Sequence, residues 1–89
     1  MTTSLTADVL QDELAVSVAR VLAAANRRAE ESGIDLVQSL ISISQRGVDQ
    51  DWVWRVNYSP KNYIGRRGGD LIIDVDPNSA AVTQVLRGQ

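Results

Sequence analysis

The 89-residue chain has nine Lys and Arg residues against eleven Asp and Glu residues, a formal net charge of −2, and neither cysteine nor histidine. These counts exclude disulfides and thiolate metal sites, remove the commonest metal ligand and general base, and argue against a generally basic nucleic-acid binder. The length suits a single domain, 1–89, with one modest core. With neither a secretory signal pattern nor a run of about 20 apolar residues, we expect a cytoplasmic protein without a membrane span.

The N-terminal third has the pattern of one long helix. No glycine or proline occurs from about residue 6 to residue 32, the composition favours helix, and Gly33 follows as a stop. Such a helix reaches about 40 Å, so we expect it to cross a whole sheet with length left to overhang it. At 100° per residue, one apolar face is predicted to meet the core: Leu10, Leu14, Val18, Val21, Leu22, Ala25 and Ala29.

A second apolar stripe lies roughly opposite the first and contains Leu5, Val9, Val16 and Ala23. One interpretation is that these aliphatic side chains are simply exposed, as isolated aliphatics often are. The alternative is an interface, either for a homodimer or for another protein.

After Gly33 the sequence changes to the two-residue period of strands. In residues 36–46 isoleucines alternate with serines, which predicts a half-buried strand, and residues 47–51 follow as a turn. Residues 52–58 are the clearest strand, because large residues alternate with a mostly polar set. Its predicted core face carries Trp52, Trp54, Val56 and Tyr58. Burying the other face instead requires partners for Arg55 and Asn57, which is costly.

Two further strands are predicted in the last third of the chain. Residues 70–76 place Leu71, Ile73 and Val75 on one face, and residues 81–87 follow the turn signal that begins at Asp76-Pro77. The connections are short enough for antiparallel neighbours. The sequence therefore predicts an α+β domain in which one long N-terminal helix packs on a three- to four-stranded antiparallel sheet.

The segment between the second and third predicted strands is a glycine-bearing loop with three cationic side chains and one tyrosine. One interpretation is a solvated hairpin loop whose glycines allow positive φ. The alternative is a binding surface, because glycine lets backbone amides approach an anion and tyrosine adds a stacking surface. The candidate binding residues are Lys61, Asn62, Tyr63, Arg66 and Arg67.

Three carboxylates, Asp70, Asp74 and Asp76, alternate along one predicted strand face. Their spacing is short enough to share a cation such as Ca²⁺ or Mg²⁺. The structural alternative is that Arg55 on a neighbouring strand pairs with one of them and that Asp76 starts a turn. Because the chain has no constellation of nucleophile, base and orienting group, we expect neither an enzyme nor a cofactor or metal.

Residues 52–88 resemble small cystatin-like and nuclear-transport-factor-like domains, in particular bacterial immunity proteins of that fold, and also PepSY modules. The residues that carry the resemblance are Trp54, Val56, Pro60, the pair Gly68 and Gly69, and the strand 70–76. The resemblance implies a helix held by a curved antiparallel sheet and a function through protein contact.

These observations lead to three hypotheses. The first is a non-enzymatic protein-binding or inhibitory, immunity-like module that uses the loop at residues 61–69 and the second helix stripe. The second is a small-ligand or nucleic-acid binder, and the third is a structural subunit of a homo-oligomer that associates through Leu5, Val9 and Val16.

Overall fold

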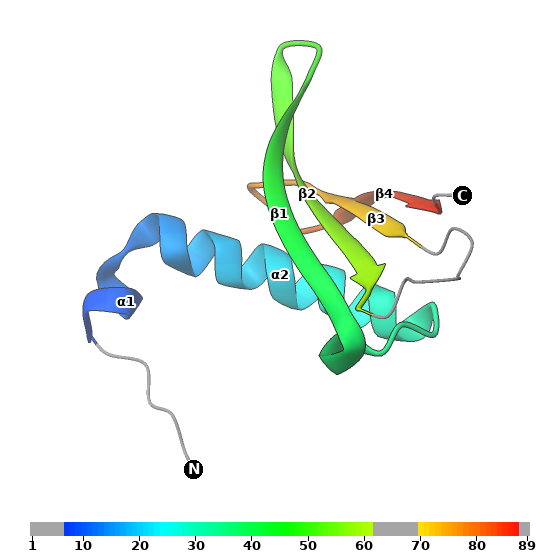
Figure 1. Ribbon diagram of the computed structural model, residues 1–89. Helices are drawn as coiled ribbons and strands as arrows, with labels where there is room; N and C mark the ends of the chain where they lie inside the picture. Colours follow the sequence, from blue (N-terminus) through cyan, green and yellow to red (C-terminus); the bar gives the residue numbers. More distant parts are fainter. Residues whose placement is uncertain (1–6, 62–69, 88–89) are drawn as a thin grey trace.

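The computed structural model describes residues 7–61 and 70–87, which form an α+β domain (Figure 1). The sheet has the order β1-β2-β3-β4 with antiparallel neighbours, and α2 packs on one of its faces. This confirms the predicted fold class, with four strands in the sheet. The elements in chain order are α1 (Ala7–Gln11), α2 (Glu13–Glu31), a 3-10 turn η1 (Leu36–Gln38), β1 (Ser39–Val48), β2 (Asp51–Pro60), β3 (Leu71–Val75) and β4 (Val82–Arg87).

The prediction of one uninterrupted helix over residues 6–32 is wrong at its start, because the chain breaks the helix at Asp12. Asp12 has an extended backbone, and its carboxylate accepts a hydrogen bond from the Ala15 N–H at 3.0 Å. An aspartate at this position satisfies an N–H that the first helical turn leaves unpaired. Asp12 therefore caps α2 and separates it from the short α1.

The predicted stop at Gly33 is confirmed. Gly33 has φ of +88°, a conformation that glycine adopts without steric cost. The Gly33 N–H donates to the carbonyl of Glu30, and the Ile34 N–H donates to the carbonyl of Ala29. This pair of bonds is the Schellman arrangement, and the side chain of Ile34 then packs against the core.

The first predicted strand begins three residues later than expected and ends two residues later, at Ser39 and Val48. Asp35 is the reason for the late start, since its carboxylate accepts from the Val37 N–H and caps the turn η1. The turn between β1 and β2 is also shorter than predicted. Val48 pairs with Asp51, so only residues 49 and 50 connect the strands, and Asp49 takes a positive φ of 56°.

The turn between β3 and β4 forms as its sequence predicted. One carboxylate oxygen of Asp76 accepts from the N–H groups of Ser79 and Asn78, at 2.9 and 2.8 Å. These two donors hold the pKa of Asp76 below its ordinary value, because they favour the charged carboxylate. Asp76 is therefore a turn residue, and the two flanking strands pair directly.

The core lies between α2 and the sheet face that the alternation predicted. It contains Val21, Ala25, Ala29, Trp54, Val56, Tyr58, Leu71, Ile73 and Val75, all buried. Three residues that the sequence assigned to this core lie largely outside it: Leu10 is 60% exposed, Leu14 61% and Trp52 40%. Val21 is the first fully buried residue of α2, and Val18 and Leu22 are partly buried at the border of the core.

One polar contact ties the helix to the sheet inside this core. The hydroxyl of Tyr58 donates to the side-chain oxygen of Asn26 at 2.7 Å. Burial raises the pKa of Tyr58 to about 12, because the phenolate is disfavoured away from water.

The raised pKa of Tyr58 gives a prediction for stability at alkaline pH. Between pH 10 and 12 the unfolded chain ionises this tyrosine while the folded chain does not, so wild-type stability falls by roughly 2 kcal/mol over that window. The Tyr58→Phe variant should start about 1 kcal/mol less stable at pH 7, where the hydrogen bond to Asn26 is lost. Urea unfolding from pH 7 to 12 tests this, since other groups titrate alike in both proteins. A stability gap that stays constant above pH 10 would contradict the assignment.

Within residues 7–61 and 70–87, neither helix combines the length and the apolar content that crossing a membrane requires.

Candidate protein-binding surface

The loop that the sequence offered as a binding surface is described only at its start. Lys61 is exposed, and its backbone N–H donates to the carbonyl of Gln38 at 2.9 Å, which anchors the end of β2 beside η1. The remaining candidates lie outside the described residues: Asn62, Tyr63, Arg66 and Arg67. A binding role for this loop stays a prediction.

The second helix stripe is interrupted. Leu5 lies outside the described residues, Val9 belongs to α1 and is 40% exposed, and Val16 belongs to α2 and is half-buried. Because the helix breaks at Asp12, α1 runs in a different direction from α2 (Figure 1). Val9 and Val16 therefore do not continue one straight stripe as a single helix would place them.

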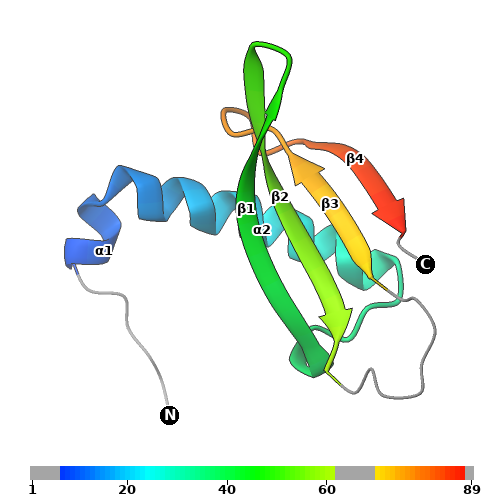
Figure 2. The same cartoon turned by 45° about the horizontal axis from the view of Figure 1, so that its top comes forward.

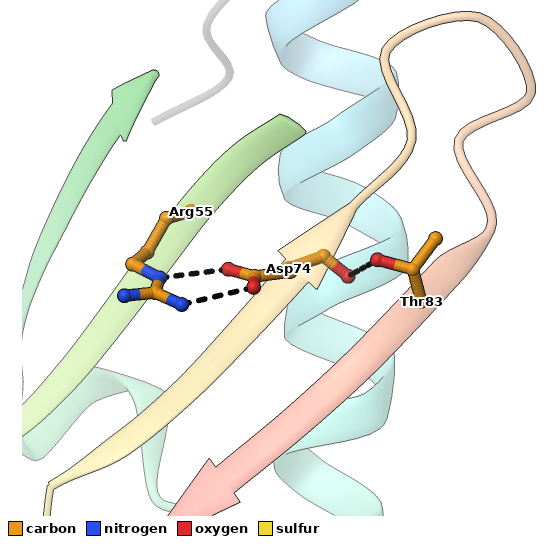
Figure 3. A network of polar contacts seen from close by, with 3 residues as sticks. All are labelled: Arg55, Asp74 and Thr83. Carbon is orange, nitrogen blue, oxygen red and sulfur yellow. Dashed lines mark hydrogen bonds and ion pairs between the residues drawn. The ribbon is translucent and has the colours of Figure 1, made fainter. Parts of the chain in front are cut away.

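The acidic strand face has a structural use. Asp74 is only 3% exposed, and Arg55 on β2 donates two hydrogen bonds to its carboxylate, at 2.8 and 3.0 Å (Figure 3). This hydrogen bonding raises the pKa of Arg55 above its ordinary value. The hydroxyl of Thr83 on β4 donates to the Asp74 carbonyl oxygen at 3.3 Å, so the site links three strands. The structure thus confirms the predicted pairing of Arg55 with a neighbouring aspartate.

An open depression of about 460 Å³ lies beside this ion pair, between the β1–β2 turn and the β3–β4 turn. Its walls include Asp49 and Asp51 from the first turn, and Asp76 and Pro77 from the second. Among the described residues, no group of three or more Asp and Glu side chains is arranged to hold a metal ion. Of the carboxylates that line it, Asp74 is held by Arg55 and Asp76 by its turn, so both of these have structural roles.

Helix α2 is longer than the sheet is wide. Its 19 residues span about 28 Å, whereas four strands at about 4.8 Å spacing are only about 14 Å across. The buried residues Val21 to Ala29 cover about 12 Å of that length, enough to cross β2, β3 and β4. The N-terminal part of α2 therefore projects beyond the β1 edge of the sheet (Figures 1 and 2).

The projecting part carries the same apolar face as the rest of α2. Further along the helix, that face packs on the sheet. Leu14 lies one turn before Val18 and two turns before Val21, so it continues the same face. Because this part of the helix lies past the edge of the sheet, Leu14 faces water and is 61% exposed.

The inner face of β1 is also left open. Ile41 and Ile43 pair with Tyr58 and Val56, and paired residues of adjacent strands share a face. Tyr58 and Val56 are fully buried, yet Ile41 is 41% exposed and Ile43 is 36% exposed. The helix covers the inner face of the sheet only from β2 onward.

The hairpin of β1 and β2 extends past the end of β3, since the β2–β3 pairing begins at Trp54. Trp52 sits on this extension and packs edge-on against Trp54, with ring centroids 5.3 Å apart. Its partner Trp54 is buried, whereas Trp52 remains 40% exposed. Four side chains on the helix side of the sheet thus form what we term the uncovered apolar surface: Leu14, Ile41, Ile43 and Trp52.

The sequence predicted part of the uncovered apolar surface. The alternation in β1 and the face of the long helix both indicated burial, and the helix length left room for an overhang. What the sequence did not contain was the position of the helix across the sheet, because a repeating apolar pattern is the same whether or not another element covers it.

The structure is thus a small α+β domain with four apolar side chains left exposed on the helix side of its sheet. No protein-family model, no curated protein and no solved structure matches the chain. Its function is therefore inferred from its own residues.

Proposed function

We propose that the chain is a small non-enzymatic protein-binding module that contacts its partner through the uncovered apolar surface. The observation that carries the proposal is the exposure of Leu14, Ile41 and Ile43, all on faces that are core elsewhere in the domain. Apolar side chains gathered on one side of a small domain are typical of interaction sites. A partner that covers them removes this area from water.

The described titratable groups support contact over catalysis. Arg55 and Asp74 hold strands together, Asp76 builds a turn, and Tyr58 is a core residue bonded to Asn26. Each group with a shifted pKa in the described part of the chain has such a structural partner. The resemblance to bacterial immunity proteins of the cystatin-like fold favours the same role.

The size of the apolar term limits how the partner binds. Fully burying a Leu or Ile side chain contributes about 1.5–3 kcal/mol, so completing the burial of the four residues contributes roughly 3–5 kcal/mol. Association itself costs at least about 4 kcal/mol. Apolar burial alone therefore gives weak binding, and a stable complex needs further contacts beside this surface.

Site-specific photo-crosslinking in the native host tests the proposal. A photoreactive phenylalanine analogue replaces Leu14 in one variant and Ile43 in another, and irradiated cells are examined for covalent adducts of the chain. We expect a discrete adduct of the same mass from both positions, because both side chains face one partner.

Val82 on β4 provides the matched control, since it is 36% exposed like Ile43 but lies at the opposite edge of the sheet. The analogue at Val82 should give no such adduct. Absence of adducts from both Leu14 and Ile43, or equal adducts from Val82, would argue against the proposed surface.

A further inference from the structure

We infer that the partner on the uncovered apolar surface is a second copy of this chain, and that the two β1 strands pair antiparallel about a two-fold axis. The inference rests on the proposed protein-binding function and names the partner. In this arrangement the two four-stranded sheets join into one, with both helices on the same side.

The β1 edge of the sheet is suited to pairing with another strand. β1 is a terminal strand of the sheet and has ten residues, and residues 39–45 of it carry no charge. A long, uncharged edge presents N–H and C=O groups that readily pair with another strand, and monomeric proteins usually blunt such edges with lysine, proline or a bulge. Residues 39–45 contain none of those residues, and their pairing with β2 runs without a register shift. The opposite edge, β4, is shorter, with six residues, and its pairing is interrupted by a shift beside Val75.

β1 is also complementary to a second copy of itself. A two-fold axis normal to the sheet leaves each face on its own side, so the inner residues Ile41 and Ile43 meet the inner residues of the other copy. Arg46 lies near one end of β1, and antiparallel pairing brings it opposite the other end of the partner strand. Like charges therefore do not face each other across the new pair.

The overhang of α2 leaves a place for a strand added at this edge. The projecting part of the helix extends over the space next to β1, on the inner side of the sheet (Figure 2). A strand added to that edge lies about 4.8 Å further out, beneath the overhang. Leu14 then covers the inner face of the partner's strand, and the partner's helix covers Ile41 and Ile43 in return. One symmetric contact thus buries both sets of exposed residues.

The size of the contact is adequate for a stable dimer. The ten residues of β1 and the first turns of α2 make a surface of roughly 15–20 residues, near the lower end of what each partner contributes to a standard interface. The strand pairing adds the main-chain hydrogen bonds that the four apolar side chains by themselves do not supply.

Sedimentation equilibrium of the purified full chain tests the inference. We expect wild type to show twice the 9.7 kDa mass of the chain. The Ile43→Lys variant should sediment as a monomer, with a dimer dissociation constant raised at least 100-fold, because an inward-facing lysine on an edge strand opposes pairing. The Val82→Lys variant carries the same new charge at the same 36% exposure on β4 and should remain a dimer.

A second measurement locates the axis independently of any folding defect. The chain has no cysteine, so single cysteines placed in turn at residues 41–45 report directly on contacts between copies. One residue of a symmetric antiparallel pair lies opposite its own copy, close enough for a disulfide. We expect one of the five variants to form a disulfide-linked dimer much faster than the Asn78→Cys variant in the β3–β4 turn.

Each contrary outcome has a distinct meaning. A wild-type monomer at the highest soluble concentration, or a dimer that Val82→Lys dissociates and Ile43→Lys leaves intact, overturns the inference. Photo-crosslinking from Leu14 and Ile43 to a different protein also overturns it while supporting the protein-binding function. Absence of photo-crosslinks from both Leu14 and Ile43 argues against the proposed protein-binding function itself. Circular dichroism of Ile43→Lys confirms that its lost dimer is not a lost fold.

Discussion

The Arg55→Leu variant is expected to unfold with a free energy about 3 kcal/mol lower than wild type. The substitution leaves the carboxylate of Asp74, whose side chain is 5% exposed, without its bidentate partner, and an unpaired buried charge is strongly destabilising. Asp74→Leu should cost less, because the Arg55 side chain is 21% exposed and keeps some contact with water. Urea unfolding followed by the fluorescence of Trp54, which is buried in the core, measures both.

The double variant Arg55→Leu with Asp74→Leu separates the charge from its surroundings. Two apolar residues at a buried ion-pair site are often no less stable than the pair, so we expect the double variant to recover most of the loss. Arg20→Leu, at an exposed position on α2, serves as the control and should change stability by less than about 0.5 kcal/mol. If the double variant is as unstable as Arg55→Leu alone, the unpaired charge is not the cause.

The second large effect compares one substitution at two leucines that the sequence assigned to the same core. Leu71→Ala is expected to cost about 3 kcal/mol, because Leu71 is fully buried and its truncation leaves a cavity. Leu14→Ala should cost less than about 0.5 kcal/mol in dilute protein, since Leu14 is 61% exposed. Urea unfolding at low protein concentration measures the two variants side by side.

The comparison also tests the uncovered apolar surface. If Leu14→Ala is as costly as Leu71→Ala in the dilute chain, α2 is packed along its whole length and no surface remains for a partner. If Leu14→Ala is mild when dilute and more costly as the concentration rises, Leu14 is stabilised by association, as the inferred dimer requires.

Element types were largely predictable because they follow from local rules. Alternation in β2 and β3 identified the core face correctly, with Trp54, Val56 and Ile73 all buried. Gly33 marked the helix end through its freedom at positive φ. The predicted element boundaries were wrong where a side chain accepts a hydrogen bond from a backbone N–H. Asp12 and Asp35 each accept such a bond, which the composition of their segments did not predict.

The partner of Arg55 was predictable in kind, because two alternating strands that pair must place their polar sets on one face. The choice of Asp74 over Asp70 or Asp76 depended on the register between β2 and β3, in which Arg55 lies opposite Asp74. Register relates two strands that are distant in the sequence, so it cannot be predicted from the residues of either strand alone.

The long helix with an apolar face was determined by the sequence itself, because side-chain periodicity and the absence of helix breakers act locally. So were the strand segments and the turn at Asp76, whereas the membership of all four strands in one sheet was shown by the structure. Only the tertiary structure decided which part of that apolar face is core, because this depends on where α2 crosses a sheet narrower than the helix is long. Val21 falls over strands and is buried, whereas Leu14, on the same face, extends past β1 into water.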